Sequence, residues 1–221
     1  TTILRMALLA FTAVASAAAA QAKEMAVIDG YGEMLQLHRE WRAFEEPPRI
    51  DDVPDYTAAT FARRHGELAR FRQRLAAIDA TRWPVEQRVD YEILHAEMNG
   101  FDFYVRVLKP WERDPAWYQV VWNEQSDTPA HEGPTIHCAL EVWTYRFPLS
   151  REAEAKLVGE LAVIAPLYRQ ARGNLTGNAR DLWVTGASTI REQLGSLDAL
   201  AERTAGGSAR LESIFCDEGF G

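Results

Sequence analysis

The chain has 221 residues, of which 47% are hydrophobic and 25% are charged, and this composition is typical of globular proteins. Its length is sufficient for one sizeable domain or two small ones. The 32 acidic and 24 basic side chains give a formal net charge of −8. This charge argues against sequence-independent binding to nucleic acid, which requires a basic surface.

The first 22 residues have the layout of a secretory signal peptide. Arg5 precedes an apolar run at residues 6–20, and the small-residue triplet Ala20-Gln21-Ala22 follows it. The run is shorter than the roughly 20 residues that a membrane-spanning helix needs. We therefore predict that residues 1–22 are a signal peptide and that the protein is exported, to the periplasm or out of the cell. A buried N-terminal helix is the alternative.

Apolar residues recur at spacings of three and four along most of the remaining chain, which is the pattern of helices with one buried face. A short helix and a proline-rich linker at residues 23–55 precede a helical domain at residues 56–221. The predicted helices are 31–44, 56–81 with Asp55 as N-cap, 85–108, 136–147, 151–172 with Ser150 as N-cap, and 178–203.

Two of these helices have a predicted stripe of buried apolar residues. The stripe of the 85–108 helix includes Val89, Ile93, Leu94 and Met98, and that of the 178–203 helix begins at Trp183. The segment at residues 109–115 contains two prolines and is predicted to be a loop. We find no strict alternation long enough for a sheet, so the sequence predicts an all-α fold of long antiparallel helices joined by proline-rich loops. An amphipathic pattern that begins near Leu211 stops at the last residue, which suggests a fragment truncated at its C-terminus.

The segment HEGPTIH at residues 131–137 contains His131, Glu132 and His137. In the zinc motif H-E-x-x-H the histidines lie four residues apart on one helix face. Here they lie six apart, so on a helix they would diverge by about 240°, and Gly133-Pro134 opposes a helix. A turn before the helix at 136 is the favoured interpretation. A polar loop that lines a substrate cleft and a metal site with a third ligand from elsewhere are the alternatives.

Other residues give weaker signals. Glu92 and His95 form one E-x-x-H pair, whereas di-iron bundles need two, so an ordinary helix surface or a buried histidine is favoured. Cys138 and Cys216 are predicted to be unpaired, buried thiols. The aromatic side chains between residues 111 and 145 are favoured to pack at helix ends, with a stacking cleft for carbohydrate or peptide as the alternative. They are Trp111, Trp117, Tyr118, Trp122, Trp143 and Tyr145.

Three stretches, residues 83–118, 131–150 and 175–200, resemble the N-terminal half of a bacterial family called "domain of unknown function 885". The resemblance covers roughly residues 56–205. Members of this family are typically larger exported or lipid-anchored helical proteins that are similar to gluzincin-type zinc metallopeptidases. The family's zinc motif, an H-E-x-x-x-G-H-H-like segment, belongs to the C-terminal half. The resemblance therefore assigns no zinc ligand and no catalytic residue to this chain.

Three functional hypotheses follow. In the first, the chain is the N-terminal helical part of an exported zinc-dependent peptidase or hydrolase. It lacks the zinc motif, so zinc would bind only in a longer parent, whose C-terminal half is the missing partner and whose substrate is a peptide or small molecule. In the second, it is a non-enzymatic periplasmic binding module that uses the aromatic-rich region. Under either hypothesis, the candidates for lining a substrate cleft are His131, Glu132, His137, Trp143 and Tyr145. The third is a self-contained metal site at residues 131–137.

Overall fold

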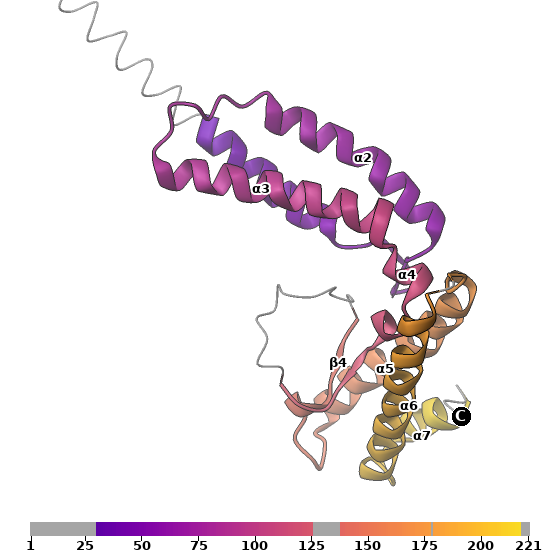
Figure 1. The fold of residues 1–221 in the computed structure, drawn as a ribbon. Coiled ribbons are helices and arrows are strands. Elements are labelled where there is room, and N and C mark those ends of the chain that lie inside the picture. The colour runs from indigo at the N-terminus through magenta and orange to yellow at the C-terminus, as the bar shows by residue number, and fades with distance from the viewer. Residues whose placement is uncertain (1–29, 126–137, 178, 218–221) are drawn as a thin grey trace, which may run out of the picture. The chain divides into compact units, whose positions relative to one another are not determined.

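The computed structural model describes residues 30–125, 138–177 and 179–217. These residues are mostly helical, with two sheets of two short strands each, so the all-α prediction is confirmed (Figure 1). No helix among them is both long enough and apolar enough to cross a membrane. The predicted signal peptide at residues 1–22 and the segment with His131, Glu132 and His137 lie outside the described residues.

The chain divides into two compact units. The described part of unit 1 consists of residues 30–45 and 64–103, and unit 2 consists of residues 46–63 and the described residues from 104 onward. The first division falls after Glu45, the second falls inside the helix α2 (Ala58–Ala76), and the third falls at the end of the helix α3 (Val85–Phe103).

Unit 1 contains a helix at residues 30–45, most of α2, and α3. The predicted helices at 31–44 and 85–108 are therefore confirmed, since α3 continues as a π-helical turn at Tyr104–Leu108. The helix predicted at 56–81 ends earlier, at Ala76. Beyond it, Asp79 accepts hydrogen bonds from the backbone N–H and hydroxyl of Thr81 at 3.1 and 2.6 Å, which forms a turn instead of another helical turn. The core of the unit consists of Met34, Leu37, Trp41, Leu68, Leu75, Ile78, Trp83, Leu94 and Met98.

The start of α2 differs from the prediction. Thr57 rather than Asp55 occupies the N-cap, because its hydroxyl accepts a hydrogen bond from the Thr60 N–H at 3.3 Å. The Asp55 carboxylate stabilises this cap, because it accepts hydrogen bonds from the Thr57 N–H at 3.0 Å and from the Thr60 hydroxyl at 2.5 Å. Burial by itself raises the pKa of Asp55, but these hydrogen bonds outweigh it and hold the pKa below its ordinary value.

Unit 2 contains the helices α5 (Arg151–Asn174), α6 (Arg180–Arg203) and α7 (Ala209–Asp217). The predicted N-cap of α5 is confirmed, because the Ser150 hydroxyl accepts from the Ala153 N–H at 3.1 Å. The predicted loop at 109–115 instead contains the short helix α4 (Pro110–Arg113), followed by a 3-10 turn at Pro115–Tyr118. Proline suits the first turn of a helix, because an N–H group at that position would have no acceptor within the helix.

The helix predicted at 136–147 is wrong over its described part. Residues Leu140–Glu141 form the strand β4, which pairs in parallel with β3 (Val121–Trp122), and a 3-10 turn follows at Val142–Thr144. The side chains alternate, with Leu140 and Val142 buried and Glu141 exposed. The second small sheet pairs β1 (Arg49–Ile50) with β2 (Val53–Pro54) in antiparallel register within the predicted linker.

A buried glutamine on α6 holds β3 in place. The Gln193 carbonyl accepts from the Val120 and Val121 N–H groups at 3.0 and 2.6 Å, and its amide donates to the Val121 carbonyl at 3.0 Å. The buried face of α6 is Gly186, Gln193, Leu197 and Leu200. The predicted stripe is therefore wrong at its start, since Trp183 is exposed and its indole N–H donates to the Gly177 carbonyl.

Candidate functional site

The two predicted cleft residues that the structure describes, Trp143 and Tyr145, differ in exposure. Trp143 is 41% exposed, whereas Tyr145 is buried. The Tyr145 hydroxyl donates to the Glu160 carboxylate at 2.7 Å, and the Lys156 ammonium lies 5.1 Å from the centre of its ring. Burial, followed by the bond to Glu160, raises the pKa of Tyr145. Tyr145 thus packs against α5, and a cleft that includes His131, Glu132 and His137 stays a prediction.

Most of the other aromatic side chains serve packing. Trp111, Trp117 and Tyr118 are buried in unit 2, and the Tyr118 hydroxyl donates to the Trp111 carbonyl at 3.0 Å. Trp122 is partly exposed, like Trp143. The preferred interpretation, packing at helix ends, holds for the three buried residues.

The remaining candidate residues do not assemble into a reactive centre. Glu92 and His95 are both exposed on α3, and the described residues include no group of three or more His, Cys, Asp or Glu side chains placed to hold a metal ion. Cys138 and Cys216 are unpaired, as predicted, but Cys138 is half-buried and Cys216 is exposed, whereas both were predicted to be buried. Burial raises the pKa of Cys138 to about 12, so its thiol stays protonated and unreactive at neutral pH.

A row of exposed apolar residues runs along α3. Val85, Val89, Ile93 and Phe103 are 62%, 49%, 50% and 48% exposed, and Ala96 and Gly100, between them, are also exposed. These six residues, here called the α3 ridge, follow one another at spacings of four, four, three, four and three. Such spacing places them on one face of the helix and is typical of a helix that pairs with another.

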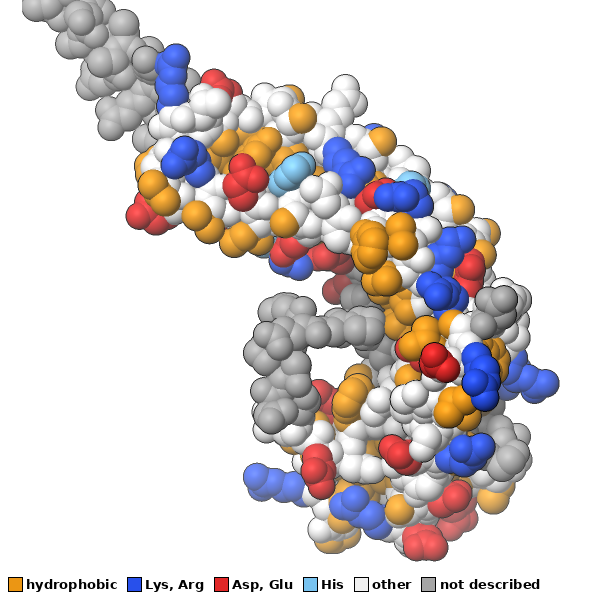
Figure 2. All heavy atoms as spheres, viewed as in Figure 1, with side chains coloured by type: hydrophobic (Ala, Val, Ile, Leu, Met, Phe, Trp, Pro, Cys, Tyr) orange, Lys and Arg blue, Asp and Glu red, His pale blue; other side chains and the backbone are white. Residues whose placement is uncertain are grey.

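The ridge corrects the predicted buried stripe of this helix. Leu94 and Met98 are buried as predicted, but Val89 and Ile93 lie on the exposed ridge. The helix therefore has two apolar faces, and only the face with Leu94 and Met98 packs into the core of unit 1. In Figure 2, hydrophobic side chains are visible among polar ones along the part of unit 1 formed by α3.

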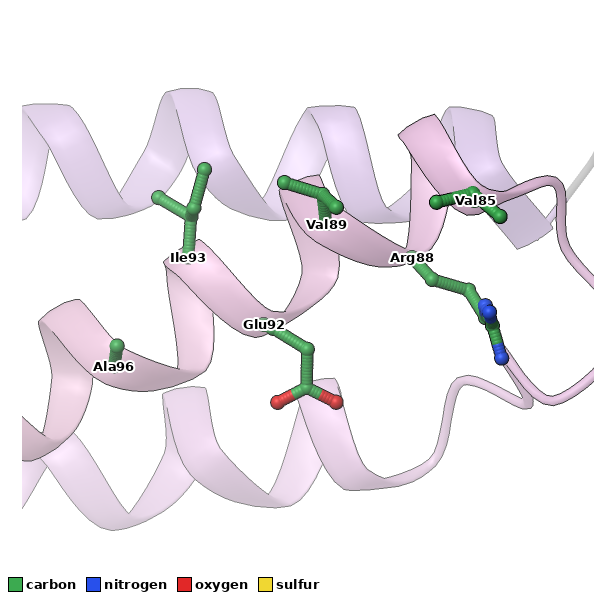
Figure 3. A pocket seen from close by; sticks show the side chains of 6 residues that line it. All are labelled: Val85, Arg88, Val89, Glu92, Ile93 and Ala96. Atoms are coloured by element: carbon green, nitrogen blue, oxygen red, sulfur yellow. The ribbon is translucent and has the colours of Figure 1, made fainter.

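The first half of the ridge borders a shallow groove with a volume of about 510 Å³. Val85, Val89 and Ile93 lie along one edge of α3, while Arg88 and Glu92 project to the other side (Figure 3). A second hollow of about 510 Å³ lies at the α2–α3 connection, and Arg88 and Glu92 line it too. The ridge is thus flanked on this side by one basic and one acidic side chain.

The other flank carries two carboxylates that are bonded within unit 1. Asp90 accepts a hydrogen bond from the Tyr31 hydroxyl at 2.6 Å, and Glu97 forms an ion pair with Arg42. The first contact raises the pKa of Tyr31, so this phenol stays protonated. These side chains fix the orientation of α3 on the 30–45 helix and leave the ridge facing away from the core.

Comparison with protein-family models, curated proteins and solved structures returned no match to this chain. The resemblance to the "domain of unknown function 885" family therefore stays a prediction, as does a role as part of a zinc peptidase.

Proposed function

We propose that this protein is a helical binding module that binds an amphipathic helix of a protein along the α3 ridge. The observation that carries the proposal is the second apolar face of α3, exposed although the first face already packs in the core. Single exposed apolar side chains are common on protein surfaces, but a continuous row of them marks an interaction site. The contact surface is therefore on α3 and differs from the aromatic-rich region that the second sequence-based hypothesis named.

The shape of the surface favours a helix over a small molecule. Among the described residues, the groove beside the ridge is lined only by those between Val85 and Ala96 of α3. Sites for small molecules are concave and enclose most of their ligand, and one face of one helix does not enclose a ligand. A partner helix instead inserts side chains at the same spacings of three and four into such a face.

The charges beside the ridge favour a protein over a lipid surface. Helices that lie on membranes have predominantly basic flanks, which attract anionic lipids. Here Arg88 and Glu92 both line the groove, and the other flank carries Asp90 and Glu97. The formal net charge of the chain, −8, also opposes attraction to an anionic membrane.

A binding experiment with a synthetic helix tests the proposal. The probe is a fluorescently labelled amphipathic peptide of three heptads, with leucine and alanine at its two apolar heptad positions. We expect fluorescence anisotropy to give a Kd on the order of 10 µM, typical of a small interface. Ile93→Glu should weaken binding at least tenfold, by about 1.4 kcal/mol or more, because the contact would bury an unpaired carboxylate.

Ala69→Glu is the matched control, because Ala69 is also exposed on a helix of unit 1 but belongs to α2 and not to the ridge. Its affinity for the probe should equal that of the wild type. Far-UV circular dichroism verifies that both variants fold. Equal affinity of the Ile93→Glu and Ala69→Glu variants would refute the proposal, as would absence of binding by the wild type.

A further inference from the structure

Within the described part of unit 1, no close contact requires a glycine at position 100 of the α3 ridge. A Cβ atom built at Gly100 meets no described atom within 4 Å, and the residue lies inside a regular helix. Glycine is less favourable than alanine in a helix interior, and its usual benefit is the close approach of another backbone. Ala96 and Gly100 are the two small residues of the ridge, and they lie between the large residues Ile93 and Phe103.

The sizes of the ridge residues suit pairing with an identical ridge in the opposite direction. Suppose that a two-fold axis passes between Ile93 and Ala96. Ile93 of one copy then lies opposite Ala96 of the other, Val89 opposite Gly100, and Val85 beside Phe103. In the first two of these contacts a large side chain meets a small residue, as interdigitation of helices requires. Parallel pairing instead places Gly100 opposite Gly100 and leaves a void.

The flanking polar residues favour the same direction. In the antiparallel pair, Glu92 lies next to Asn99 of the other copy. The Asn99 carbonyl already accepts from Arg72 at 2.8 Å, so its NH₂ group is the end that can donate to the carboxylate. In a parallel pair, Glu92 would lie next to Glu97 of the other copy, and like charges at these positions are unfavourable.

From this complementarity we infer that the helix that binds the α3 ridge is α3 of a second copy of this chain, in antiparallel orientation. The inference rests on the proposed function and names its partner. The paired segments, Val85–Phe103, have 19 residues and are about 28 Å long. A contact of this length falls at the lower end of specific interfaces, so the dimer should form with a Kd on the order of 10 µM.

Sedimentation equilibrium of the full chain tests the inference. Between about 1 and 500 µM we expect the wild type and Ala69→Glu to pass from monomer to dimer, and Ile93→Glu to stay monomeric throughout this range. All three proteins share residues 1–29, so any association through that segment is common to them. A wild type that is monomeric at about 500 µM, or an Ile93→Glu variant that dimerises like Ala69→Glu, would overturn the inference.

The outcome is separable from that of the proposed function. The wild type could be monomeric and still bind the synthetic helix, with binding lost in the Ile93→Glu variant. This result would refute self-pairing and would still support the proposed function as a binding module. If the wild type neither dimerises nor binds the synthetic helix, both proposals are refuted.

Disulfide formation tests the antiparallel orientation of the two α3 helices. Val89→Cys and Gly100→Cys chains are made in a background without Cys138 and Cys216, and the two chains are mixed and oxidised. Antiparallel pairing yields mainly the mixed disulfide, whereas a majority of the two homodimeric disulfides would refute this direction.

Discussion

Replacing Trp41 with alanine is expected to lower the free energy of unfolding by about 4 kcal/mol, because truncation of a fully buried tryptophan leaves a large cavity. Trp41 is 0% exposed. Its ring centre lies 5.3, 5.4 and 5.7 Å from those of Phe44, Phe71 and Phe101, so the side chain joins the three helices that are described in unit 1. Urea denaturation followed by circular dichroism measures the loss.

Trp41→Phe is the informative control for this substitution. The Trp41 indole N–H is buried and has no hydrogen-bond partner among the described residues, so phenylalanine removes an unsatisfied donor while it keeps an aromatic ring. We expect this variant to lose about 1 to 2 kcal/mol, well below the loss for alanine. A Trp41→Ala variant within about 1 kcal/mol of the wild type would contradict the assignment of Trp41 to the centre of this core.

Gly186→Ala is expected to destabilise the protein by about 2 to 3 kcal/mol, although alanine is the better helix former. A Cβ atom at Gly186 would lie 2.8 Å from the Ala116 nitrogen and 2.9 Å from the Pro115 Cβ. These atoms belong to the 3-10 turn at Pro115–Tyr118, and a backbone atom cannot move aside as the end of a flexible side chain can. The absence of a side chain is thus what lets α6 approach this turn.

Gly195 on the same helix provides the matched control. A Cβ atom there meets nothing within 4 Å, so Gly195→Ala should stabilise the protein by about 0.5 to 1 kcal/mol. Thermal or urea unfolding of the two variants should therefore give shifts of opposite sign. If both substitutions stabilised the protein, the close contact between α6 and the Pro115–Tyr118 turn would be wrong.

The sequence was sufficient to predict helices whose signals are local. α5 begins after Ser150 as predicted, because the cap and the apolar spacing both act within a few residues. The helix predicted at 136–147 is wrong over its described part, because the conformation of residues 138–147 depends on groups that are distant in the sequence. The Leu140 N–H donates to the Val120 carbonyl at 2.6 Å. The Val120 N–H in turn donates to the side-chain carbonyl of Gln193, which lies far along the chain. No local pattern contains these partners.

The candidate site could not be predicted from periodicity for a different reason. Two rows on the 85–108 helix satisfy the spacing of three and four, one with Leu94 and Met98 and the other with Val89 and Ile93. Periodicity predicted a helix correctly but merged both rows into one buried stripe. Only the packing of the 30–45 helix against α3, with Tyr31 bonded to Asp90, shows which row is covered.

Thiol accessibility at position 96 tests most directly whether a helix covers the α3 ridge. Ala96→Cys and the control Ala69→Cys are made without Cys138 and Cys216, and their alkylation is timed with and without the synthetic helix. With the helix at five times its Kd, we expect alkylation at position 96 to slow about sixfold and that at position 69 to stay unchanged. An unchanged rate at position 96, under conditions where the probe is bound, would contradict the assignment of the ridge as the binding surface.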